Sequence, residues 1–139
     1  MIDTVSVSLV KPALAALLVA LLSGCATDPR ATPESIVKER AESRWKALIA
    51  GNYDGAYKLT APAYRDATSF ERYRATIGGA VQWIDAEAVS VTCEPEKCDV
   101  RLRVGSKSPL LFKSDLVIDT AVDEVWVREG GQWWLSLKP

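Results

Sequence analysis

The sequence predicts an α+β fold, in which three N-terminal helices pack on a curved antiparallel sheet of four or more strands. Between residues 33 and 77, apolar residues recur every three or four positions, which is the spacing of helices. From Val81 onward, apolar and polar residues alternate, which is the spacing of half-buried strands. Helices that precede strands in this segregated order are typical of α+β domains.

Length and composition fit a single globular domain. Of the 139 residues, the first 24 have the features of a removable segment, and the remaining 115 are a usual size for one compact domain. Hydrophobic residues make up 48% of the chain and charged residues 25%, which is enough to form a core without a metal. The net charge of −1 creates no field that would attract polyanions, so we expect no nucleic-acid partner.

The N-terminal segment predicts export from the cytoplasm. Residues 12–22 form an uncharged apolar run, which follows Lys11. Such a run is too short for a membrane helix, which needs about 20 residues, but suits a secretory signal, whose apolar core has about 7–15. A buried helix that happens to end in Cys25 is the alternative, but a core helix would carry polar residues on one face. We therefore predict a signal peptide over residues 1–24.

Residues 22–25, with the sequence Leu-Ser-Gly-Cys, closely resemble the bacterial lipobox. The resemblance implies that the Cys25 thiol receives a diacylglyceryl group and that the chain is cleaved before this residue. Residues 25–32 would then be a short lipidated tether, and the membrane would be a partner through Cys25. In Gram-negative lipoproteins, an Asp after the lipidated Cys commonly causes retention at the inner membrane. Because Ala26 stands there, we expect the periplasmic face of the outer membrane.

The first helix is predicted from Pro33 to just before Gly51, with Thr32 as its N-cap. Its apolar residues fall on one face, which should cover a sheet. These residues are Val37, Ala41, Trp45, Leu48 and Ile49.

Two shorter helices are predicted before the sheet. One runs from Asp54 to about Thr60 and stops ahead of Pro62, because the residue before a proline disfavours helical geometry. The other opens at a capping box formed by Thr68 and Glu71 and ends at the glycine pair 78–79.

The first two strands are predicted to form a hairpin with one apolar face. Placing Cys93 opposite Cys98 across a four-residue loop also places Val91 opposite Val100, and Val89 opposite Leu102. Opposed residues in antiparallel strands are close enough for a disulfide.

The cysteines are predicted to have separate structural roles. In an oxidising compartment, Cys93 and Cys98 would form a disulfide, and Cys25 would carry the lipid. A catalytic redox pair is the alternative, but such pairs usually resemble C-x-x-C at a helix start. The chain has no histidine and only two thiols besides Cys25, so we expect no tetrahedral zinc site and no other metal.

Later strands follow from alternation and a turn signal. One long strand is predicted to carry Phe112, Leu116, Ile118, Thr120 and Val122 on one face. A further strand runs over residues 125–129, and the glycines at 130 and 131 form a two-residue hairpin. This turn pairs Val127 with Trp134 and Trp126 with Leu135. The last strand, residues 132–137, is apolar on both faces and is predicted to be central.

The order of elements and several segments resemble the nuclear transport factor two-like (cystatin-like) superfamily. The segments are Gly-Asn-Tyr-Asp-Gly-Ala-Tyr at 51–57, Pro-Ala-Tyr-Arg at 62–65, and the strand pair at 125–135 that ends in Trp-Trp-Leu. The resemblance covers residues 33–137, within a single predicted domain of residues 33–139. It implies a cone-shaped fold with a pocket between the first helix and the concave sheet. Such folds host enzymes and non-catalytic modules alike.

Within the cone, four aromatic residues are predicted to line a pocket: Trp45, Tyr57, Tyr73 and Trp133. An apolar ligand or an envelope protein would be the partner of such a site.

The alternative function is a small pocket enzyme of the ketosteroid isomerase or polyketide cyclase type, which would need a buried carboxylate opposite a tyrosine. Asp66, Asp85 and Glu87 are more readily explained as solvated acids, and Tyr57, Tyr64 and Tyr73 as packing residues. The sequence therefore predicts no catalytic residues and no cofactor. Asp115 and Asp119 are expected to form cross-strand ion pairs with Arg101 and Arg103.

Overall fold

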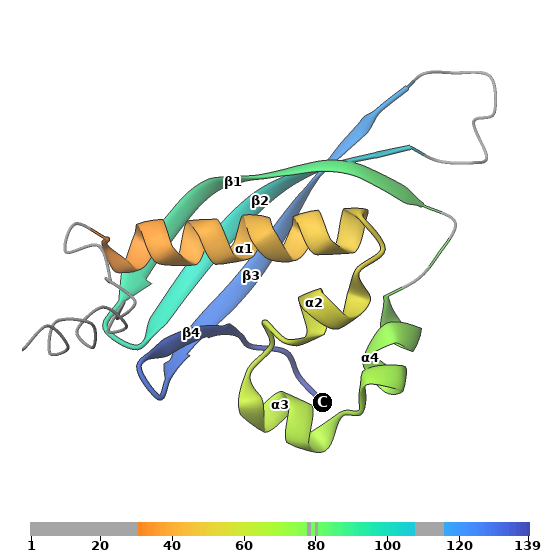
Figure 1. Cartoon of the computed structure of the whole chain (residues 1–139). Helices are drawn as coiled ribbons and strands as arrows, with labels where there is room; N and C mark the ends of the chain where they lie inside the picture. Colours follow the sequence, from red (N-terminus) through yellow and green to blue (C-terminus); the bar gives the residue numbers. More distant parts are fainter. Residues whose placement is uncertain (1–30, 78, 80, 108–115) are drawn as a thin grey trace, which may run out of the picture. The chain divides into compact units, whose positions relative to one another are not determined.

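The computed structural model describes residues 31–77, 79, 81–107 and 116–139 (Figure 1). Residues Ala31–Pro139 form one compact unit. Cys25, the predicted signal peptide at 1–24 and the tether up to residue 30 lie outside the described residues. No helix in the described part of the chain is long and apolar enough to cross a membrane.

Helix α1, Pro33–Ile49, lies along the concave side of the sheet (Figure 1). It begins as predicted, because the Thr32 hydroxyl accepts a hydrogen bond from the Ser35 amide at 3.2 Å and proline occupies the first turn. The predicted apolar face is buried at four of its five positions, and Ile49 is half-buried. Arg44 is buried on the same face, which the apolar pattern did not predict.

Three short helices follow: α2 at Tyr53–Tyr57, α3 at Pro62–Ala67 and α4 at Phe70–Thr76. The described residues therefore hold four helices, and the prediction of three is wrong. Pro62 was predicted only to end the preceding helix, but it also occupies the first turn of α3. An N–H at that position would have no partner within the helix, so its absence costs no hydrogen bond.

Helix α4 is capped by Ser69 and not by Thr68. The Ser69 hydroxyl accepts a hydrogen bond from the Arg72 amide at 3.3 Å. The Thr68 amide donates to the Tyr64 carbonyl and closes α3. Thr68 therefore ends one helix, and the next residue begins another, which is why the predicted capping box is displaced by one position.

The sheet has four antiparallel strands in the order β1-β2-β3-β4 and curls around α1 (Figure 1). Their bounds are Gln82–Glu94, Lys97–Lys107, Ile118–Glu129 and Gln132–Leu135. This arrangement confirms an α+β fold with a curved antiparallel sheet.

The register of the first hairpin is confirmed near its turn, where Cys93 pairs with Cys98 and Val91 with Val100. Further along, the prediction is wrong, because a bulge between residues 88 and 90 places Ala88 opposite Leu102. Val89 is left unpaired with 56% of its surface exposed. Alternation alone does not reveal a bulge, since one extra residue reverses the faces of all the residues beyond it.

Helix α1 is also tied to the outer edge of β1 at this bulge. The Lys38 ammonium donates to the Ala88 carbonyl at 2.9 Å, and Glu42 accepts from the Ala88 amide at 3.1 Å. Lys38 and Glu42 themselves form an ion pair at 2.7 Å. These contacts satisfy backbone groups that an edge strand otherwise exposes.

The hairpin between β3 and β4 is confirmed, with Val127 opposite Trp134 and Trp126 opposite Leu135. The predicted strands around residues 122 and 125 are one continuous strand, β3, while Phe112 lies outside the described residues.

The prediction of a central last strand is wrong, because β4 is at the edge of the sheet. Its outer side bonds to the α2–α3 connection, where the Leu135 amide donates to Leu59 and the Leu135 carbonyl accepts from Ala61. A loop thus takes the place of a fifth strand.

The core has two parts. The larger lies between α1 and the concave sheet and includes Val37, Leu48, Leu102 and Trp126. The smaller is an aromatic cluster centred on Tyr64 and Tyr73 of α3 and α4, against which Tyr57, Phe70 and Trp134 pack. Helices α3 and α4 therefore bury their aromatic residues together, beside β4.

Within this smaller cluster, the Tyr73 hydroxyl is buried and makes no hydrogen bond of good geometry with a described residue, although Arg44 is a charged neighbour. We expect Tyr73→Phe to raise the free energy of unfolding by roughly 1 kcal/mol, because the variant no longer desolvates an unpaired hydroxyl. Tyr57→Phe is the matched control. Its hydroxyl donates to the Thr68 carbonyl at 2.6 Å, so this variant should lose about 1 kcal/mol. Urea denaturation measures both, and a destabilised Tyr73→Phe would contradict the prediction.

The same substitution has a predicted pH dependence. Burial raises the pKa of the Tyr73 phenol, and the charge of Arg44 offsets part of the rise. The folded state therefore favours the neutral phenol, and this contribution is lost as pH rises above about 10, the ordinary pKa of tyrosine. Above about pH 10, urea denaturation should therefore show that the wild type loses more stability than Tyr73→Phe.

Candidate functional site

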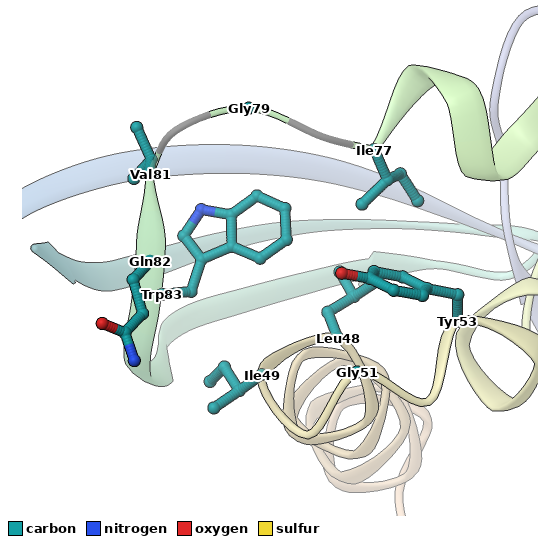
Figure 2. Close-up of a pocket in the computed structure, with 9 residues that line it drawn as sticks. All are labelled: Leu48, Ile49, Gly51, Tyr53, Ile77, Gly79, Val81, Gln82 and Trp83. Carbon is teal, nitrogen blue, oxygen red and sulfur yellow. The ribbon is translucent and has the colours of Figure 1, made fainter. Parts of the chain in front are cut away.

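One pocket in the described residues lies where α1 ends and β1 begins (Figure 2). Its volume is about 500 Å³, which is within the range of small-molecule sites. The lining residues come from the end of α1, the start of α2, the end of α4 and the first part of β1. They are Leu48, Ile49, Gly51, Tyr53, Ile77, Gly79, Val81, Gln82 and Trp83.

Apolar surface forms more than half of the pocket's lining, and polar groups form the rest. Figure 2 shows the Trp83 ring facing the side chains of Ile77 and Leu48 across the cavity, with the Tyr53 hydroxyl pointing inward. Val81, at the rim, has 51% of its surface exposed. The Arg74 guanidinium lies 5.8 Å from the centre of the Tyr53 ring, which places a positive charge next to the pocket. This arrangement suits a ligand with an apolar body.

The four residues predicted to line a pocket lie deeper in the fold. Trp45 and Trp133 belong to the main core, with 6% and 4% of their surfaces exposed. Tyr57 and Tyr73 belong to the aromatic cluster, with ring centres 5.2 Å apart. None of the four lines the cavity of Figure 2, although Trp45 packs edge-on against Trp83 at 5.3 Å and so supports its wall.

The most distinctive polar feature is a buried carboxylate, Glu124 of β3, that the sequence analysis missed. Its Oε1 accepts hydrogen bonds from Arg44 at 2.6 Å and from the indole N–H of Trp45 at 2.8 Å. Its Oε2 accepts from the indole N–H of Trp126 at 2.9 Å. Both charged side chains are less than a tenth exposed. We name Arg44, Glu124, Trp45 and Trp126 the Glu124 cluster.

A signal for this cluster was present in the sequence. The alternation that puts Val122 on the concave face also puts Glu124 and Trp126 there. Dividing the strand between residues 122 and 125 concealed that pattern. On α1, Arg44 lies three residues after Ala41 and four before Leu48, within the buried face.

The chemistry open to Glu124 is restricted by its partners. A buried carboxylate near a tyrosine was the expected mark of an enzyme, and the charge of Glu124 does act on the Tyr73 phenol. However, both oxygens of Glu124 are occupied by donors, and it does not line the pockets found in the described residues. The cluster therefore has the features of a structural ion pair.

The carboxylates considered in the sequence analysis lie on the surface. Asp66 is exposed on α3. On the outward face of the sheet, Arg103 contacts Asp85 at 3.1 Å, Glu87 at 3.6 Å and Asp119 at 2.9 Å. The predicted pairing of Arg103 with Asp119 is thus confirmed.

Arg101 has a different partner from the expected one, namely Asp123, at 3.6 Å. Asp115, the other predicted partner, lies outside the described residues.

Cys93 and Cys98 form a disulfide-capable pair at the end of the first hairpin. Cys98 is fully buried in the main core, whereas Cys93 is partly exposed. In the part of the chain that the structure describes, no group of three or more cysteine or acidic side chains is arranged to hold a metal ion.

Comparison with known proteins reveals similarity of fold at low sequence identity. No protein-family model matches the sequence, and no curated protein matches it. A solution structure of a SEC-C motif containing protein from Rhodopseudomonas palustris has a TM-score of 0.55 and 14% identity, over 70% of this chain and 73% of that one. A crystal structure of a SEC-C motif containing protein from Psychrobacter arcticus has a TM-score of 0.58 and 17% identity, over 80% of this chain.

The chain spans 63% of the length of the Psychrobacter protein. At these identities the likeness concerns the fold alone.

The Glu124 cluster generates a stability prediction. We expect Glu124→Gln to lower the free energy of unfolding by about 3–5 kcal/mol, because it leaves the buried Arg44 charge without a counterion. Asp123→Asn is the matched control one residue away. It breaks an exposed ion pair and should cost less than about 1 kcal/mol. Chemical denaturation measures both, and equal losses would contradict a special role for Glu124.

Proposed function

We propose that this protein is a lipid-anchored envelope lipoprotein whose domain is a non-catalytic binding or accessory module. The observation that carries the anchor is the apolar run at residues 12–22 followed by Leu-Ser-Gly-Cys, with Cys25 as the acylated residue. The domain then faces the periplasm, on the outer membrane because Ala26 follows the cysteine.

The apolar pocket of Figure 2 supports the binding role. Hydrocarbon and indole form more than half of its lining, and the Tyr53 hydroxyl points into the cavity and supplies a polar contact. Pockets with this balance are the usual sites for small apolar ligands. An apolar ligand or an apolar side chain of an envelope protein fits this site. This pocket replaces the four-residue aromatic lining, Trp45, Tyr57, Tyr73 and Trp133, as our candidate site.

We also propose kinship with the nuclear transport factor two-like superfamily. Support comes from the long first helix lying along a curled antiparallel sheet, together with the residue segments noted in the sequence. The kinship leaves the choice between binding and catalysis open.

The alternative, a small pocket enzyme, rests on Glu124 and Tyr73. As a general base, Glu124 would have to break its ion pair with Arg44 and accept a proton from the substrate. The non-catalytic function is favoured because both oxygens of the carboxylate already accept hydrogen bonds.

Anchoring is tested by labelled palmitate in a Gram-negative host. We expect the label in the full chain and none in Cys25→Ala, because acylation requires this thiol. Cys93→Ala is the matched control and should keep the label. An unlabelled and uncleaved wild-type chain in the cytosol would refute the proposed anchor.

Export to an oxidising compartment predicts a disulfide between Cys93 and Cys98. When cells are denatured in the presence of a maleimide and without a reductant, the exported chain should be labelled at neither cysteine, whereas a chain that lacks residues 1–24 should be labelled at both, because denaturation exposes the buried Cys98. Reduction should lower the free energy of unfolding by about 2 kcal/mol, the value for so short a loop. Labelling of both cysteines in the exported chain would argue against the assignment.

A further inference from the structure

Four buried side-chain groups have no hydrogen-bond partner among the described residues. They are the Nε atoms of Arg40 and Arg44 and the hydroxyls of Thr68 and Tyr73. Each of these groups can donate a hydrogen bond, and the two Nε–H groups can do nothing else. Unpaired buried donors are rare in native proteins because each one costs free energy. Because the two hydroxyls can also accept, and Arg44 lies close enough to Tyr73 to act on its pKa, the Nε–H of Arg40 is the donor that most needs an acceptor.

Three of these donors, on Arg40, Arg44 and Tyr73, lie near one another where α1 faces α4 and β4, and with Arg65 and Trp134 they form what we call the seam. The side chains of Arg40 and Arg65 both contact Trp134, with guanidinium carbons 5.1 and 5.0 Å from the ring centre. Trp134 packs in turn against the aromatic cluster that contains Tyr73. Arg44 follows Arg40 by one helical turn, and its charge acts on the Tyr73 phenol.

The seam carries more positive than negative charge. Arg44 is neutralised by Glu124. Arg65 donates to the backbone carbonyls of Lys58 and Thr60, which orient its guanidinium without neutralising it. Arg40 forms neither a hydrogen bond nor an ion pair with another described residue, and burial lowers its pKa. The guanidinium groups of Arg40 and Arg65, neither of which has a counterion in the described part of the chain, therefore both contact the indole ring of Trp134.

Burial distinguishes this seam from an ordinary basic surface. Arg44 has 7% of its surface exposed and Tyr73 none, while Arg40, Arg65 and Trp134 are half-buried. The seam is thus accessible to solvent at Trp134 and has unpaired donors further in. In such a partly desolvated position, charge-assisted hydrogen bonds are stronger than they are in water.

We propose that this seam binds a phosphate group, with Arg40 and Arg65 as its charged contacts beside Trp134. Two unneutralised guanidinium groups match the charge of about −1.5 to −2 on a phosphate monoester better than the single charge of a carboxylate. The flat guanidinium fork also pairs with phosphate oxygens through two parallel hydrogen bonds.

Two sources supply this chemistry: a free phosphate compound, or the headgroup of an anionic lipid. The lipid source rests on the proposed anchor, and the free source does not. In either case, the proposed phosphate site is separate from the apolar pocket of Figure 2, because the two share no residue.

The first experiment uses inorganic phosphate and the full chain in a non-ionic detergent at constant ionic strength. We expect phosphate to raise the Tm of the wild type. In Arg40→Met, the dissociation constant for phosphate should increase about 10-fold or more, because a charge-assisted contact is lost. Arg101→Met is the matched control, since it removes an exposed arginine from the outward face of the sheet.

Two further measurements separate binding from a structural role. Without phosphate, Arg40→Met should be about as stable as the wild type, because removal of a half-buried charge that has no counterion among the described residues offsets the loss of its contact with Trp134. Arg40→Lys keeps the charge but not the fork, and its affinity should be intermediate.

The second experiment reconstitutes the chain into vesicles of phosphatidylcholine, with or without phosphatidic acid, in phosphate-free buffer. The headgroup of phosphatidic acid is a phosphate monoester. A rise in Tm that requires both phosphatidic acid and Arg40 identifies a lipid headgroup as the source. An Arg40-dependent response to free phosphate alone identifies a soluble ligand and leaves the anchor proposal untouched. No Arg40-dependent response in either experiment, or an equal loss in Arg101→Met, would overturn the proposed site.

Discussion

The carboxylate of Glu124 is the interaction on which the rest of this fold depends. It lies on the concave face of the sheet and accepts hydrogen bonds from Arg44 and Trp45 of α1 and from Trp126 of its own strand. A buried charge is tolerated only when its partners are well placed, so this arrangement fixes the rotation and the axial position of α1 on the sheet. Apolar contacts alone would allow neighbouring positions of the helix at a smaller cost.

The position of α1 determines where a pocket can form. Helix α1 ends at Ile49, while the sheet continues past it along the first residues of β1. Trp83 therefore has Trp45 on one side and the cavity on the other. On the opposite flank of α1, the same rotation that buries Arg44 brings Arg40 to Trp134. The apolar pocket and the arginine seam are thus two consequences of one helix placement.

The proposed anchor and the proposed ligand sites lie in different parts of the chain. The anchor is inferred from residues 12–25, which have the sequence properties of a lipoprotein signal. The ligand sites are inferred from side chains that meet only in the folded domain. A domain with this pocket and seam would bind the same ligands in any compartment. An anchored domain, however, would meet envelope lipids and proteins at high local concentration.

The sequence by itself determined the features that depend on neighbouring residues. The cap at Thr32, the hairpin at the glycine pair 130–131 and the register from Cys93 to Cys98 follow from local backbone chemistry, so they could be predicted. Only the tertiary structure decided the bulge at Val89, the edge position of β4 and the ion pair between Arg44 and Glu124. Each of these depends on what a distant segment places against it, since a strand is central or at an edge only relative to its neighbours. A buried charge, likewise, is stable only where the partner that neutralises it has been brought close by the fold.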